Sequence, residues 1–182
     1  MDKEFHVVFF SSRNKDNTMV KDFTQRIRTF VTDKTVDELK NDFNSFADKG
    51  QVGELSRFYY SINSTNLELA NRDLIHYLVD RPLATPSQIK NKLVSVSALN
   101  KNLNTHKWLL DCDFQDEEKL QQAVQRLTEL SKDEDIVEKI GKTIHGYFII
   151  VKHGFDTRIF LEEFPEITNK KNGNELVAWK IK

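Results

Sequence analysis

The chain has 182 residues, enough for a domain with a sizeable core, and 38% of them are hydrophobic, including 13 Phe. Its 27 basic and 28 acidic residues give a formal net charge of -1, which excludes a global basic field for nucleic acid, so any nucleic-acid contact must be local. The single cysteine, Cys112, excludes an internal disulfide and a CxxC-type zinc site. The sequence has no signal-peptide pattern, and no apolar run approaches the roughly 18 residues of a membrane span. We therefore expect a cytoplasmic protein without membrane contact.

The first part of the chain, residues 1–104, has the pattern of a mixed α/β unit. Its expected elements are a strand over 4–11, helices over 18–31 and 35–50, a strand over 55–63, and two helices that start at 65 and 85. The first of these helices is predicted because Val20, Phe23, Ile27 and Phe30 recur at helical spacing. Capping patterns predict the other helix starts, at Thr35-x-x-Glu38, Thr65-x-x-Glu68 and Thr85-Pro86-x-Gln88.

Residues 105–182 carry a second set of elements. In chain order these are a strand over 106–113, a helix over 116–131, strands over 135–142 and 147–153, a short helix over 156–163 and a strand over 175–182. The run from Tyr147 to Val151 is apolar without alternation, which predicts a central strand with both faces covered. This β-α-β-β-α-β order is that of ferredoxin-like and RNA-recognition-motif-like (RRM-like) domains. Since no linker interrupts the chain, we predict an α+β fold in which an N-terminal α/β unit, 1–104, joins an RRM-like unit, 105–182, in one composite domain.

Two aspartates, Asp111 and Asp113, end the apolar strand in the segment "KWLLDCDF". In a regular strand they lie on the face opposite Trp108 and Leu110, which are expected to pack against helices. Side chains about 7 Å apart on an open face suit one hard cation with oxygen ligands, such as magnesium. A simpler explanation is that the pair ends a strand in solvent and that Asp113 stabilises the N-terminus of the next helix.

This strand with its D-x-D, the following helix and the hairpin "GKTIHGYFIIVKHGFDTRIF" resemble the archaeo-eukaryotic primase-like superfamily, especially its small phage-type members. The resemblance extends over nearly the whole chain, because that family joins an N-terminal α/β unit to an RRM-like unit. It implies that Asp111 and Asp113 are catalytic ligands of Mg2+ or Mn2+. The first candidate for the family's third acid is Glu166, and the next candidates are Asp156 and Glu163.

A second family motif is a G-x-H at the start of the second hairpin strand, where its histidine contacts nucleotide phosphate. Here Gly146-Tyr147-Phe148 places Phe148 at the histidine position, and this difference bears on catalysis more than on the fold. The candidate phosphate ligands are the basic residues around the hairpin, Lys142, His145, Lys152, His153 and Arg158. The two histidines are also explained as a turn residue and a strand-end residue.

The strand over 55–63 adds one further nucleotide-binding candidate, Arg57. It shares a face with Tyr59, and a sheet tyrosine beside an arginine can stack a base. A strand tyrosine is also commonly half-buried packing, so both explanations stand. Cys112 alternates away from the acids and is expected to be an inert core thiol.

The resemblance implies a primase-like nucleotidyltransferase of phage or mobile-element origin that acts on nucleotides or nucleic acid in DNA replication, in the cytoplasm of its host. Two magnesium ions held by Asp111 and Asp113 would then polarise the attacking hydroxyl and stabilise the in-line transition state. The alternative is a catalytically inactive binding protein on the same scaffold that engages nucleic acid or a host or replication protein, and Phe148 favours it. A metal-dependent nuclease would use the same two acids. Serine-hydrolase and P-loop enzymes are disfavoured, because their G-x-S-x-G and Walker A motifs are missing.

Overall fold

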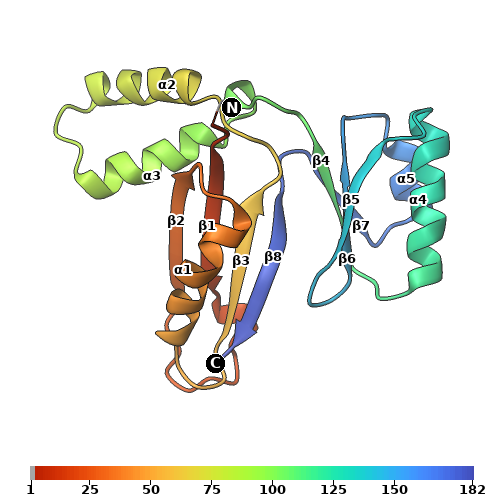
Figure 1. Ribbon diagram of the computed structural model, residues 1–182, viewed down its shortest axis with the longest axis horizontal. Helices are drawn as coiled ribbons and strands as arrows, with labels where there is room; N and C mark the ends of the chain where they lie inside the picture. Colours follow the sequence, from red (N-terminus) through yellow and green to blue (C-terminus); the bar gives the residue numbers. More distant parts are fainter. Residues whose placement is uncertain (1–2) are drawn as a thin grey trace. The chain divides into compact units, whose positions relative to one another are not determined.

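The computed structural model describes residues 3–182, and within them the fold is mixed α+β, with five α-helices and eight strands. The strands form two four-stranded antiparallel sheets (Figure 1). The described chain divides into two compact units, the first containing residues up to 104 together with 176–182, and the second containing 105–175. No helix in residues 3–182 has the length and apolar character needed to cross a lipid bilayer.

The first unit contains the sheet with strand order β2-β1-β3-β8. Its strands are β1 His6–Ser12, β2 Arg26–Thr32, β3 Leu55–Ser61 and β8 Asn174–Ile181, and its helices are α1 Val36–Asp48, α2 Leu67–Asp80, α3 Pro86–Ser97 and the 3-10 turns Asn14–Asp16 and Asn100–Asn102. The helix α1 covers one face of this sheet, where Leu39 and Phe43 pack against Phe10 and Phe58. The Phe10 ring centroid lies 5.0 Å from that of Phe58 and 5.6 Å from that of Phe43, so aromatic packing dominates this core.

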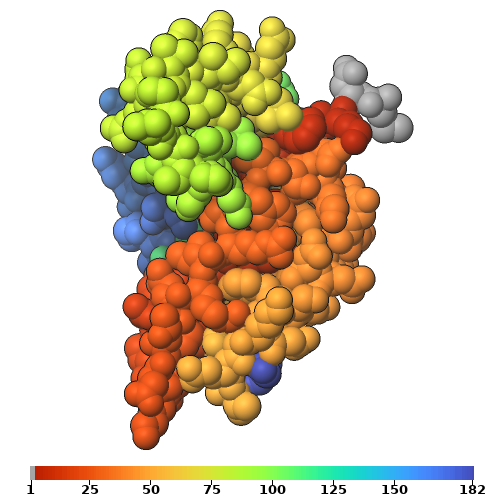
Figure 2. Space-filling view, turned by 90° about the vertical axis from the view of Figure 1, so that its left-hand side faces the viewer, coloured from red at the N-terminus to blue at the C-terminus, as the bar shows by residue number. Residues whose placement is uncertain are grey.

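The helices α2 and α3 form a hairpin, and α3 contacts β1 and β2. Figure 2 shows the yellow-green atoms of this hairpin beside the red-orange atoms of the β1–β2 region. The predicted capping boxes at Thr35 and Thr85 are confirmed. The one at Thr65 is wrong, because Asn66 caps α2 and the Thr65 hydroxyl donates to the Ser97 carbonyl, at 3.0 Å.

The predicted helix over 18–31 is wrong, since this part of the chain contains β2 instead. β2 pairs with β1 in a register that sets Arg28 opposite Phe10 and Val31 opposite Val7. Alternating β-branched residues of β2 favour a strand, and pairing with β1 satisfies its backbone. The helical spacing of four apolar residues was therefore overridden by a partner strand that local periodicity does not reveal.

The second unit contains the sheet with strand order β5-β6-β4-β7. Its strands are β4 Trp108–Cys112, β5 Val137–Lys142, β6 Tyr147–Val151 and β7 Ile167–Lys170, and its helices are α4 Glu117–Ser131 and α5 Arg158–Glu163. Both helices lie over the same face of this sheet (Figure 1), where Leu127 and Phe160 join a buried core with Leu110 and Ile149. All five residues of β6 are buried, which confirms the prediction of a central strand.

The C-terminal strand departs from the predicted arrangement. The fourth strand of the second sheet is β7, which was not predicted, whereas the expected strand over 175–182 is β8 and lies beside β3 in the first sheet. The amide of Gly53 donates to the Lys182 carbonyl at 2.6 Å, and the Lys182 amide donates to the Glu54 carbonyl at 3.1 Å. The second unit therefore ends at residue 175 and not at 182. With only four residues, β7 is too short to give a periodic signal.

Candidate functional site

The strand β4 positions the predicted acidic pair. Leu110 and Cys112 enter the helix-side core, so Asp111 lies on the opposite face, as alternation along the strand predicts. Its side chain is 27% exposed, and Asp113, just beyond the strand, is exposed. Both carboxylates are therefore accessible to solvent.

The face that carries Asp111 is not open at its centre, contrary to the prediction. Leu109, Phe148 and Ile150 lie on this face, each only 2–3% exposed. The Phe148 ring lies against Gly141 of β5, where an added Cβ atom would come within 2.3 Å of the ring Cζ. Phe148 is thus a buried packing residue.

Each of two predicted metal ligands has a lysine partner. The Nζ atom of Lys170, on the neighbouring strand β7, donates to the Asp111 carboxylate. The Nζ atom of Lys119, on α4, donates to Glu166 at 2.5 Å, and this hydrogen bond lowers the pKa of Glu166. The Asp113 amide donates to the Glu166 carbonyl at 3.0 Å, so the two backbones are adjacent while the Glu166 side chain is held by α4.

These partners determine how well the site fits a cation. Within residues 3–182 there is no group of three or more His, Cys, Asp or Glu side chains that could hold a metal ion. A lysine ammonium at Asp111 supplies the positive charge that the carboxylate needs, and it would repel a divalent cation at the same oxygens. The residues fit a magnesium ion poorly, and magnesium binding stays a prediction for experiment.

The other candidate acids and the predicted helix cap also have structural roles. Asp156 pairs with Arg158, which lowers the pKa of Asp156 to about 2, and Glu163 pairs with Arg126 at 2.7 Å. The N-terminal cap of α4 is Asp116 and not Asp113, since Asp116 accepts hydrogen bonds from the backbone amides of Glu118 and Lys119, at 2.9 and 3.0 Å. Neither Asp156 nor Glu163 belongs to a strand of the sheet that carries Asp111.

The candidate phosphate ligands of the hairpin do not gather at one place. Lys142 and His145 lie at one end of β6, beside the turn, and Lys152 and His153 follow its other end. A five-residue strand separates the two groups by roughly 13 Å or more. The ring nitrogens of His153 lie 3.0 Å from the Gly154 carbonyl oxygen and from Asp133 Oδ2, which accept hydrogen bonds from the ring, and these hydrogen bonds raise the pKa of His153.

Arg57 belongs to the first unit and is committed to its own neighbours. The guanidinium donates to Asp16 at 2.6 Å and to the Tyr59 hydroxyl at 3.2 Å, and the residue is only 7% exposed. Because the buried Arg57 guanidinium is paired with the Asp16 carboxylate, it presents little charge to a phosphate. Arg57 and the hairpin residues belong to different units.

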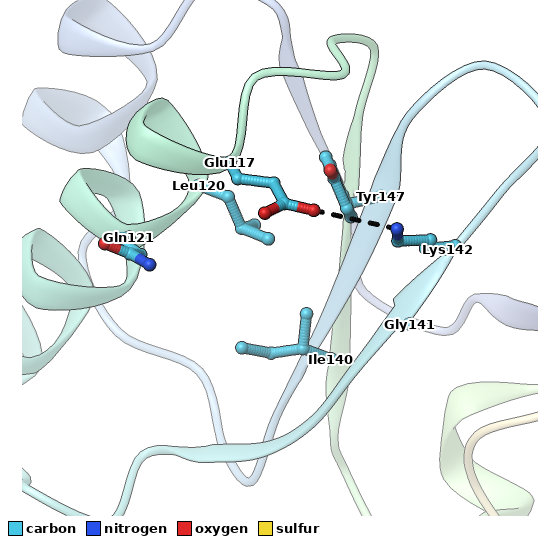
Figure 3. Close-up of a pocket in the computed structure, with 7 residues that line it drawn as sticks. All are labelled: Glu117, Leu120, Gln121, Ile140, Gly141, Lys142 and Tyr147. Atoms are coloured by element: carbon cyan, nitrogen blue, oxygen red, sulfur yellow. Dashed lines mark ion pairs between the residues drawn. The ribbon is translucent and has the colours of Figure 1, made fainter.

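One feature that sequence reasoning missed is a pocket of about 420 Å3 in the second unit, between α4 and β5 (Figure 3). Leu120 of α4 and Ile140 of β5 lie on opposite sides of it, and Tyr147 lies beside them. Glu117 and Lys142 form an ion pair across its rim, with 3.7 Å between the charged atoms. The pocket forms between the first turns of α4 and the edge strand β5. The sequence of one strand, such as "VEKIGK", does not indicate which helix lies beside it.

Comparison of the chain with protein-family models, curated proteins and solved structures finds no match.

Proposed function

We propose that the chain is a binding protein that keeps a primase-like scaffold without nucleotidyl-transfer chemistry. The observation that carries this proposal is the pairing of Asp111 with Lys170. In a two-metal transferase the carboxylates of the D-x-D would share cations, whereas here the ammonium group of Lys170, on a neighbouring strand, contacts Asp111. Phe148, buried against Gly141 where the family has histidine, supports the same conclusion.

The scaffold part of the proposal rests on topology. The strand order β5-β6-β4-β7, with α4 and α5 on one face, agrees with the arrangement expected of a split βαβ unit. A ferredoxin-like second unit is accordingly part of this proposal. The primase-like part of the proposal rests on the D-x-D at the end of β4, whose Asp111 lies on the face opposite the helices.

The charge of the second unit favours a protein partner over nucleic acid. Residues 105–175 contain ten Lys and Arg against fifteen Asp and Glu, a net charge of -5. A polyanion gains little from such a surface, because its affinity depends on releasing counterions to basic side chains. The basic residues of the hairpin are moreover divided between the two ends of β6.

Isothermal titration with Mg2+ and Mn2+ tests the proposal. We expect the native chain to bind neither ion more tightly than the Asp111→Asn and Asp113→Asn double variant, because Lys170 already neutralises Asp111. A matched control replaces two exposed aspartates of α1, Asp37→Asn with Asp42→Asn, to measure non-specific cation binding by surface carboxylates.

Metal binding that disappears in the Asp111 and Asp113 double variant but persists in the α1 control would overturn the proposal. A primer-synthesis assay with labelled nucleotides, and a nuclease assay beside it, would then separate polymerisation from cleavage. The transferase remains the second candidate because both carboxylates are accessible at the end of one strand.

A further inference from the structure

We propose that the open edge of β5 and the neighbouring pocket bind an extended peptide of a partner protein by strand addition. This inference rests on the proposed function, since it names the partner class and the surface that a binding protein of this kind would use. The site consists of the β5 edge at Ile140 and Lys142 and of the pocket wall formed by Leu120 and Tyr147. These residues are hereafter called the β5 groove.

The backbone of β5 offers hydrogen bonds to an added strand. β5 ends the sheet and pairs with β6 on one side only, among the residues that the structure describes. The Thr143 amide donates to the Gly146 carbonyl at 2.8 Å, so Thr143 faces β6. Because antiparallel pairs alternate between bonded and non-bonded, the amides and carbonyls of Lys142 and Ile140 point away from β6. Such an edge is a template for strand addition.

The pocket lies on the side of the edge to which these same residues direct their side chains. Ile140 is opposite Ile149 and Lys142 is opposite Tyr147, and both partners belong to the helix-side core. Ile140 nevertheless remains 44% exposed, which leaves an apolar wall facing solvent. A volume of about 420 Å3 accommodates a large aliphatic side chain of an added strand, and it lies within the range of about 300 to 1,000 Å3 of ligand sites.

Charge selects a basic peptide over a second copy of this chain. The first turn of α4 places Glu117 at the groove, and the whole second unit has a net charge of -5. The ion pair of Glu117 with Lys142 joins side chains that are 72% and 71% exposed, so it is weak and easily exchanged for charges of a ligand. A second copy that paired through its own β5 edge would bring the same acidic first turn of α4. We therefore assign the groove to an extended segment with a central aliphatic residue flanked by Lys or Arg.

Fluorescence anisotropy with the full chain and a library of labelled, acetylated and amidated octapeptides tests the assignment. The library alternates threonine with variable residues, and we expect binders to combine a central Leu, Ile or Val with a neighbouring Lys or Arg. Lys142→Pro removes the outward amide donor while leaving the β5–β6 hydrogen bonds in place. It should weaken the best peptide about fivefold to tenfold. Lys142→Ala, which keeps the donor and loses the same side chain, is the matched control and should bind the best peptide about fivefold to tenfold more tightly than Lys142→Pro.

Three results would overturn the inference. They are equal affinity of the two Lys142 variants, absence of any library member that binds more tightly than a peptide of threonine alone, and a dimer in light scattering that Lys142→Pro dissociates. The last result would assign the groove to a second copy. Far-UV circular dichroism and the β6 amide signals of each variant verify folding. Failure of the peptide assay leaves the metal titration unaffected, so loss of this inference and loss of the proposed function are distinguishable.

Discussion

At the scale of single residues, the thiol of Cys112 shows how the fold changes a side chain's chemistry. Burial raises the pKa of Cys112 to about 12, and the charges of Asp111 and Asp113 add to this effect. Because the thiolate is the reactive form, we expect Ellman's reagent at pH 8 to modify the native thiol about a thousandfold more slowly than the unfolded chain. Rapid modification of the native protein would show that Cys112 is accessible.

The same shift makes stability depend on pH. A thiol whose pKa is higher in the folded than in the unfolded chain binds its proton more tightly when folded, so its contribution is complete below pH 9 and is lost as the pH rises from 9 toward 12. Cys112→Ala provides the comparison, since it removes this titration while other groups still titrate. Urea denaturation of both proteins at pH 8 and pH 10 measures the difference.

Residues of the site were predictable only as far as alternation along one strand allows. The sequence pattern correctly placed Asp111 on the face opposite Leu110, because that depends on β4 alone. Its partner Lys170 was not predictable, because the contact requires the position of β7 beside β4. Asp111, a candidate metal ligand, thus forms an ion pair with Lys170, which lies 59 positions later in the chain.

At the scale of elements, the close contact between β5 and β6 depends on Gly141. An added Cβ atom would lie 2.3 Å from Cζ and 2.4 Å from Cε1 of the Phe148 ring, and this ring is buried. We expect Gly141→Ala to lower the free energy of unfolding by about 1–3 kcal/mol through overpacking, measured by urea denaturation.

Phe148→Leu provides the control for this contact. It removes the ring atoms that the new methyl group would meet, so the two substitutions together should cost less than the sum of their separate effects. Strict additivity would mean that the Phe148 ring is not what makes Gly141 necessary.

The elements also show which parts of the fold local sequence determines. The helix starts at Thr35 and Thr85 were predictable because each capping box joins residues three apart. β2 and β7 were not, since each becomes a strand by pairing with a distant part of the chain. The β5 groove belongs to the same class, because it forms where two elements meet.

At the scale of the whole molecule, the last seven residues return to the first unit after the second unit is complete. Leu176 is buried, and Val177 and Ala178 pack against the core of Phe10 and Phe58. Deletion of residues 176–182 should therefore destabilise the first unit by roughly 3 kcal/mol or more, from lost apolar burial. The second unit retains all four strands of its sheet in such a variant.

Hydrogen exchange followed by mass spectrometry measures the two units separately in this deletion variant. We expect the amides of β1 and β3 to lose protection while those of β4 and β6 keep most of theirs, because local stability follows the contacts that each unit retains. Lys180→Gln, which loses only an exposed ion pair with Asp48, is the control and should leave both units protected. Equal loss of protection in both units would contradict this prediction and would show that the chain unfolds as one cooperative domain, as the absence of a linker in the sequence suggests.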